Sequence, residues 1–138
     1  MNVASFIGAA TPRKYVIGYE DRAATPEQLE QMQQIVRDAM REGAMGVASS
    51  LMYPPGLFAD TAELIALSEA AAEFDGMYVS HMRDEGAHML EAIDELITIA
   101  RETGIRAEIY HLKSSGQQNW PLFDEAVRMI EDARAEGL

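Results

Sequence analysis

The sequence predicts an α/β fold of four consecutive βα units, which is half of a (β/α)8 TIM barrel. Short apolar runs alternate with amphipathic helical segments, and such a series favours a parallel sheet with right-handed crossovers. The last two units repeat at about thirty residues, the length of one βα unit. Eight units need about 250 residues. We therefore expect residues 1–138 to be a partial barrel domain, an internal fragment of a longer protein; a small open sheet complete in itself is the alternative.

The first unit is an apolar run, Val3 to Ile7, followed by a loop and a helix. Thr25 is the expected N-cap, with Pro26 at the first helical position and Gln28 completing a capping box. Gly43 is expected to close the helix. The apolar residues at helical spacing are Leu29, Met32, Val36, Ala39 and Met40.

The second unit begins with a strand, Met45 to Leu51, and continues through the loop Tyr53 to Gly56. Asp60 and Glu63 mark the start of its helix, and Gly76 follows the end. The inward face of this helix is expected to hold Leu64, Leu67, Ala71 and Phe74.

The third unit pairs a strand, Met77 to Ser80, with a helix from about Glu85 to Thr103 that Gly104 caps. Its apolar stripe is Leu90, Ile93, Leu96, Ile97 and Ala100. The fourth unit pairs Ala107 to Tyr110 with a helix starting near Pro121. Its expected inward residues are Phe123, Val127, Ile130 and Ala133.

Composition excludes several classes of partner and site. The net charge of −12 argues against nucleic acid or an anionic membrane surface, because either would repel the chain. There is no apolar run of about 18 residues and no signal-peptide pattern, so we expect no membrane span and take the cytoplasm as the default location. The absence of cysteine excludes disulfides and thiolate metal ligands within this chain.

Two of the three histidines hold equivalent positions. His81 and His111 end the predicted third and fourth strands, and the carboxyl ends of barrel strands form the active-site face. Neighbouring strands lie about 4.8 Å apart, so the two imidazoles can converge on one zinc ion. Each could instead be a polar strand-end residue bonded to a carbonyl, and the spacing leaves both readings open. His88, early in a helix, is expected on a solvated face.

Polar residues cluster after the two histidines. Lys113 could hold a substrate carboxylate or polarise a carbonyl, and Tyr53 could donate to an oxyanion; a surface cation and a packing tyrosine are the alternatives. Arg83 follows His81 by two residues. No nucleotide-binding loop, serine elbow or cysteine nucleophile is present.

Four runs together resemble motifs of the N-acyl-D-amino-acid deacylases (D-aminoacylases) of the metal-dependent amidohydrolase superfamily. They are Asn2–Gly8, Ser50–Gly56, Ser80–Gly86 and His111–Lys113, in that order along the chain. The resemblance implies a hydrolase of non-peptide C–N bonds that cleaves N-acyl-D-amino acids with zinc-activated water. The expected partner is thus a small-molecule N-acyl amino acid.

The resemblance also implies roles for single residues. His81 and His111 match the histidines that bind the tightly held zinc, Tyr53 a tyrosine that binds or polarises the scissile group, and Lys113 a lysine near the substrate carboxylate. Arg83 lies inside a matched run and is grouped with the substrate-site residues. The family's His-x-His pair, cysteine ligand and late aspartate base are not in this sequence, so the 138-residue segment alone is expected to be inactive.

Two alternatives stay open at this point. One is a cyclic-amidase-like barrel hydrolase with the same ligands and another substrate. The other is a non-catalytic α/β module, either a binding protein or a subunit that completes its barrel by association. Half a barrel has two open sheet edges, which favour pairing, so a homo-oligomer is expected.

Overall fold

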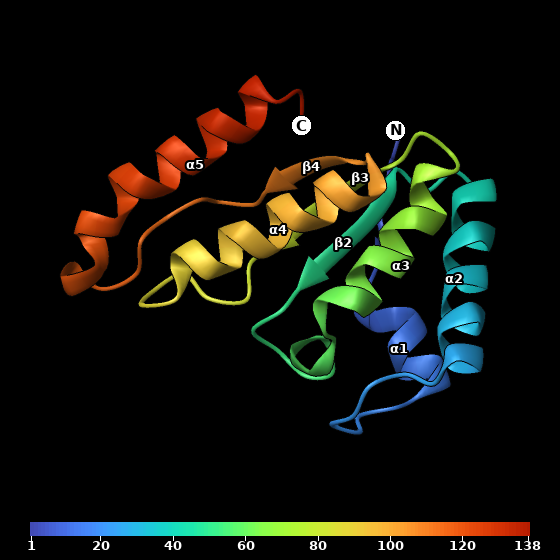
Figure 1. Ribbon diagram of the computed structural model, residues 1–138. Helices are drawn as coiled ribbons and strands as arrows, with labels where there is room; N and C mark the ends of the chain where they lie inside the picture. The colour runs from blue at the N-terminus through green and yellow to red at the C-terminus, as the bar shows by residue number, and fades with distance from the viewer.

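The strands form one parallel sheet in which spatial order equals sequence order (Figure 1). The computed structural model describes all residues, 1–138. The strands are β1 (Ile7–Gly8), β2 (Gly46–Ser50), β3 (Met77–His81) and β4 (Arg106–Ile109). Each pairs in parallel with the next. The predicted α/β class and the parallel sheet are therefore confirmed.

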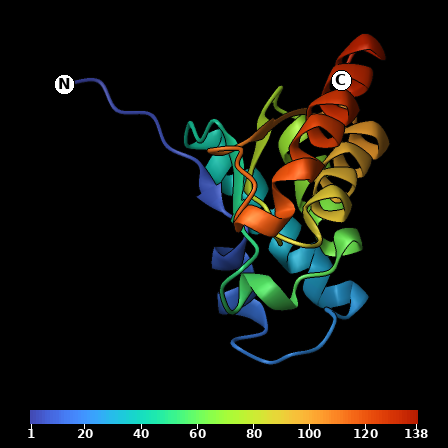
Figure 2. The ribbon, with the colours of Figure 1, turned by 90° about the vertical axis from the view of Figure 1, so that its left-hand side faces the viewer.

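The helices stand in a row that follows the order of the strands. They are α1 (Ala10–Val16), α2 (Pro26–Arg41), α3 (Thr61–Ala72), α4 (Met89–Thr103) and α5 (Phe123–Ala135), with 3-10 turns η1 (Gly56–Phe58) and η2 (Gln117–Leu122). Each helix packs against the next, and α2, α3 and α4 cover one face of the sheet (Figure 1). The residues before β1 lead away from the sheet (Figure 2). None of the helices has the length and apolar character to cross a membrane.

The first long helix begins and ends where the sequence predicts. The Thr25 side chain accepts a hydrogen bond from the Gln28 N–H, and the Gln28 side chain accepts one from the Thr25 N–H, which completes the capping box. The last helical residue is Arg41, and Gly43 follows with φ +100°. Of the predicted stripe, Met32, Val36 and Met40 are buried.

The next two helices are capped largely as predicted. Asp60 is the N-cap of α3 and accepts from the Glu63 N–H at 2.8 Å. Gly104 ends α4 in the left-handed conformation with φ +67°. The start of α4 differs, because Asp84 Oδ1 accepts from the N–H groups of Gly86 and His88 and holds these residues in a turn. The helix therefore begins at Met89.

The N-terminal region differs from the sequence prediction. The expected strand over 3–7 is only the two-residue β1, and the expected loop before Thr25 contains the short helix α1. The reason is tertiary: Arg13 of α1 is buried and paired with Glu63 of α3. A contact between such distant residues leaves no periodic pattern in the sequence.

Three predicted inward residues are exposed. Phe74 lies beyond the end of α3, and Phe123 and Val127 lie on the outer side of α5. The buried residues of α5 are Ala133, as predicted, and Ala126, which the prediction did not include. Helix α5 packs on α4 and η2, and a cavity of about 400 Å³ lies between α4, β4 and α5. The helix therefore buries a narrower stripe than its apolar pattern suggested.

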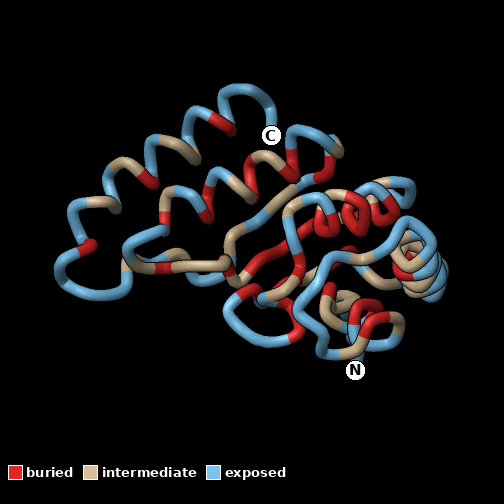
Figure 3. The backbone as a smooth tube through the Cα atoms, turned by 60° about the horizontal axis from the view of Figure 1, so that its bottom comes forward, coloured by how far each residue is buried: buried red, intermediate tan, exposed pale blue.

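The larger core cluster lies between the sheet and the helices (Figure 3), and a smaller one lies between α4 and α5. Tyr78 of β3 is in this core and its hydroxyl bonds Ser49 Oγ at 2.7 Å, while Ser49 in turn donates to Ser80 at 2.9 Å. Burial raises the pKa of the Tyr78 phenol. Because successive strand residues point to opposite faces, His81 lies on the face opposite Ser80, away from the helices.

Both edges of the sheet are open. Strand β1 pairs only with β2, and β4 pairs only with β3. The edge strands are thus the two that the sequence predicts. Association through them stays a prediction.

Candidate metal centre

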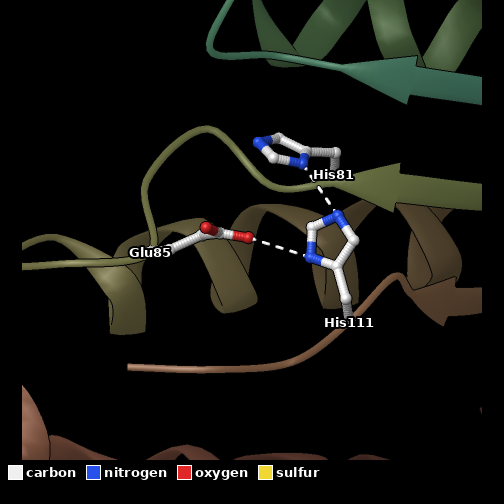
Figure 4. A group of neighbouring side chains, drawn as sticks. All are labelled: His81, Glu85 and His111. Carbon is white, nitrogen blue, oxygen red and sulfur yellow. Dashed lines mark hydrogen bonds and ion pairs between the residues drawn. The ribbon is translucent and has the colours of Figure 1, made fainter. Parts of the chain in front are cut away.

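His81 and His111 face each other at the carboxyl ends of β3 and β4. His81 is the last residue of β3, and its Nδ1 lies 2.9 Å from His111 Nε2 (Figure 4). The ring centroids are 4.7 Å apart at an interplanar angle of 71°. The structure thus brings together the two histidines that the sequence selects as metal ligands.

The position of His111 differs in one respect from the expectation. Strand β4 ends at Ile109, so His111 follows the strand instead of ending it. The Tyr110 N–H still bonds the Ser80 carbonyl at 2.9 Å, which keeps the chain beside β3. His111 then adopts φ +40°, a left-handed conformation that is uncommon outside glycine. At His111 the backbone thus leaves the direction of the strand, and the His111 imidazole lies against His81.

Glu85 is a member of the cluster that the sequence analysis missed. Its carboxylate is 8% exposed, and Oε1 lies 3.1 Å from His111 Nδ1 (Figure 4). The Ser115 N–H bonds the Glu85 carbonyl at 2.6 Å and joins the two loops that carry these residues. Ligand atoms of His81, Glu85 and His111 all lie within 4.8 Å of one another. The only sequence signal was an acidic residue four positions after a histidine, which is common on surfaces.

Lys113 completes the charge pattern of the cluster. Its Nζ donates to Glu85 Oε1 at 2.5 Å and lies 2.7 Å from His111 Nδ1. The ammonium balances the nearly buried carboxylate, which would otherwise be costly to remove from water. Lys113 thus lies where the sequence predicts, next to the histidines, and is half exposed.

The loop after β2 supplies further contacts to His81. The Tyr53 ring lies 5.7 Å from the His81 ring, measured between centroids, and Met52 Sδ lies 3.0 Å from His81 Nε2. Tyr53 is exposed and is one of the site residues that the sequence predicts, whereas Met52 is not among them. Tyr110 stacks on His111 with centroids 6.3 Å apart.

Arg83 lies outside this cluster. Its guanidinium bonds Glu95 of α4 and two backbone carbonyls, at Leu57 and Ala59. His88, expected on a solvated face, is indeed exposed at the N-cap of α4, with Glu91 at 3.4 Å.

The donor set fits zinc. Imidazole nitrogens are usual zinc ligands, and a carboxylate such as Glu85 commonly lies against the other ring nitrogen of a zinc-binding histidine. Two nitrogens bound tetrahedrally at 2.0–2.1 Å would lie about 3.3 Å apart, so the two rings need to separate only slightly from 2.9 Å. A hollow of about 400 Å³ beside them is lined partly by small residues, including Gly8, Ala48 and Ser50. These leave space next to the imidazoles.

No protein-family model matches this chain. Individual proteins, however, are similar to it over almost its whole length. A D-aminoacylase of Alcaligenes xylosoxydans xylosoxydans is 36% identical over 135 residues, covering 98% of this chain and 28% of the relative. An N-acyl-D-glutamate deacylase of the same organism is 35% identical over 140 residues, covering 100% of this chain and 28% of the relative.

A solved structure shows the same fold. The N-acyl-D-glutamate deacylase from Bordetella bronchiseptica, complexed with zinc and a phosphonate inhibitor, superimposes with a TM-score of 0.93 at 33% identity. The superposition covers 99% of this chain and 29% of that protein. The chain therefore spans less than a third of the length of the relatives that it matches. Over almost its whole length it is similar to one segment of the N-acyl-D-amino-acid deacylases, and the resemblance that its motifs predicted is confirmed.

Proposed function

We propose that this chain is part of a zinc-dependent amidohydrolase that hydrolyses the amide bond of N-acyl-D-amino acids. The observation that carries the proposal is the 2.9 Å approach of His81 Nδ1 to His111 Nε2 on adjacent strand ends. It occurs in a segment similar to deacylases, one of which was solved with zinc. The fold supports a further proposal, that residues 1–138 form four units of a (β/α)8 barrel domain.

In this proposal His81 and His111 hold the zinc ion. When bound, zinc polarises the amide carbonyl and lowers the pKa of water at the site. Glu85 Oε1, 3.1 Å from His111 Nδ1, and the Lys113 ammonium, 2.7 Å from the same nitrogen, orient that imidazole so that its Nε2 faces His81. These three residues do not complete a catalytic site. We therefore expect the isolated chain to be inactive; hydrolysis of N-acetyl-D-amino acids by it, abolished by a chelator, would contradict that expectation.

Lys113 and Tyr53 are the proposed substrate residues. The Lys113 ammonium is half exposed beside the histidines and can pair with a substrate carboxylate. The Tyr53 hydroxyl belongs to an exposed side chain next to His81 and can donate to the developing oxyanion. The similarity to a D-aminoacylase and N-acyl-D-glutamate deacylases supports N-acyl amino acids, not cyclic amides, as the substrate class. A substrate panel containing both classes would separate these reactions.

Zinc binding tests the proposal directly. We expect the purified chain, dialysed against zinc, to retain about one equivalent in elemental analysis, and His81→Ala and His111→Ala each to lose it, because each removes one ligand. The matched control is His88→Ala, since His88 is exposed and lies outside the cluster. Equal zinc content in the wild type and both ligand variants would contradict the assignment.

The open edges of β1 and β4 support a proposal about association. Unpaired N–H and C=O groups on both edges can pair with another copy of the chain. We therefore expect a dimer or a larger species in analytical ultracentrifugation. A clean monomer at micromolar concentration would contradict this part.

A further inference from the structure

Most of the hydrogen-bonding capacity of Arg83 is used within the protein. Its Nε and Nη2 donate to the two carboxylate oxygens of Glu95 at 3.0 and 2.9 Å. Its Nη1 donates to the Leu57 carbonyl at 3.0 Å, and its Nη2 also donates to the Ala59 carbonyl at 2.8 Å. A guanidinium has five N–H donors, and four hydrogen bonds are already made. Little capacity is left for a substrate carboxylate.

The two carbonyls belong to the segment between β2 and α3, residues 51–60, here called the β2–α3 loop. Leu57 links Arg83 to Tyr53, because its carbonyl accepts from Arg83 while its N–H donates to the Tyr53 carbonyl at 2.9 Å. Arg83 and Tyr53 are therefore connected through a single residue.

The same part of the chain also holds the start of this loop. The Leu51 N–H bonds the carbonyl of His81 at 3.1 Å. The β2–α3 loop is thus attached to His81 at its beginning and to Arg83 near its end. Between these two attachments lie Met52 and Tyr53, the loop side chains nearest the His81 ring.

Glu95 connects Arg83, and through it the β2–α3 loop, to the helices. It lies on α4, is 12% exposed, and also accepts from Thr61 Oγ1 at the start of α3 at 2.8 Å. A bidentate arginine–carboxylate pair is charge-assisted and sets the plane of the guanidinium. Arg83 is therefore fixed by two helices in the orientation that its carbonyl contacts require.

We propose that Arg83 is a positioning residue that holds the β2–α3 loop so that Tyr53 stays beside His81. The inference rests on the proposed function only for the role of Tyr53 at the substrate site. It replaces the expectation that Arg83 itself binds substrate. Lysine cannot take over this role, because one ammonium on a flexible stem lacks the planar fork that reaches a carboxylate and two carbonyls together.

Hydrogen exchange of the Arg83→Lys variant provides the first test. We expect the Leu57 amide, which is bonded to Tyr53, to exchange roughly tenfold faster or more than in the wild type. Amides of β2 and β3 should keep their protection. The matched control is Arg37→Lys, which breaks the bidentate pair between Arg37 of α2 and Glu73, the C-cap of α3. The β2–α3 loop should exchange as in the wild type in that variant.

A proximity measurement separates positioning from general stability. The wild type should show a nuclear Overhauser effect between the Tyr53 and His81 rings, and Arg83→Lys should lose it. The corresponding signal between the His81 and His111 rings should remain in both. If Arg83→Lys does not fold, Glu95→Gln weakens the Arg83–Glu95 pair instead. The Leu57 amide should then also exchange faster than in the wild type.

Two results would overturn the inference. One is unchanged Leu57 exchange with an intact Tyr53–His81 signal in Arg83→Lys. The other is equal acceleration in the Arg37→Lys control. Neither measurement uses zinc, so a failure of the metal-site proposal would appear in the zinc content and not in these data.

Discussion

Arg13 and Glu63 form an ion pair that is buried on both sides. Arg13 Nη1 lies 2.5 Å from Glu63 Oε2, and the side chains are 0% and 3% exposed. Arg13 Nη2 also donates to the carbonyls of Glu20 and Arg22. The pair therefore joins α1, the loop before α2, and α3. Burial raises the pKa of the Glu63 carboxyl, and the positive charge of Arg13 opposes that shift.

Removing one partner of this pair should be costly. Glu63→Gln leaves the Arg13 charge buried without a counter-ion, and we expect a loss of about 3–5 kcal/mol in the free energy of unfolding, measured by urea denaturation. The control Glu30→Gln removes an exposed partner of Arg37 and should cost less than about 1 kcal/mol. A loss at Glu63 as small as that of the control would show that the pair contributes little.

Glu85 should affect zinc affinity through His111. Its Oε1 lies 3.1 Å from His111 Nδ1, where it can accept from an Nδ1–H and leave the Nε2 lone pair free for metal. It also accepts from the Lys113 ammonium, which lies 2.7 Å from the same nitrogen. In Glu85→Gln we expect zinc affinity in calorimetry to fall about 10–100-fold. Glu91→Gln, beside the exposed His88, serves as the control and should leave the affinity unchanged. The prediction fails if both variants bind zinc as the wild type does.

The Arg37–Glu73 pair should contribute a pH-dependent stability. The hydrogen bond from Arg37 holds the pKa of Glu73 below its ordinary value. A carboxyl with a lower pKa in the folded state stabilises the protein above its unfolded pKa, and this contribution is lost as the pH falls through the folded pKa. Glu73→Gln should therefore lower the urea midpoint near pH 7 and have a smaller effect near about pH 3. An equal effect at both pH values would exclude this linkage.

Local signals in the sequence were enough to predict most of the secondary structure. The capping box at Thr25, the N-cap Asp60 and the left-handed Gly104 each act on residues no more than about four positions away. The predicted start of α4 was wrong because Asp84 Oδ1 accepts hydrogen bonds from nearby N–H groups and holds these residues in a turn. That competition between turn and helix is local, yet the helical periodicity alone did not reveal it.

The candidate site was predictable only in part. His81 and His111 could be predicted because the carboxyl ends of neighbouring parallel strands lie side by side. Glu85 was missed because a tertiary contact, the hydrogen bond from Ser115 to its backbone, places it beside His111. Arg83 was grouped with substrate residues because its motif includes it, whereas its partner Glu95 lies twelve residues away on α4.

The sequence by itself determined the order of the four strands and the four long helices, the caps at Thr25, Asp60 and Gly104, and the two histidines near adjacent strand ends. These depend on short-range hydrogen bonds and on hydrophobic periodicity, and both involve residues that are close together in the sequence. The tertiary structure alone decided the Arg13–Glu63 pair, fifty residues apart, and the bond from Arg83 to Leu57, twenty-six residues away. Such pairs form only after packing brings distant segments together, so no local pattern encodes them.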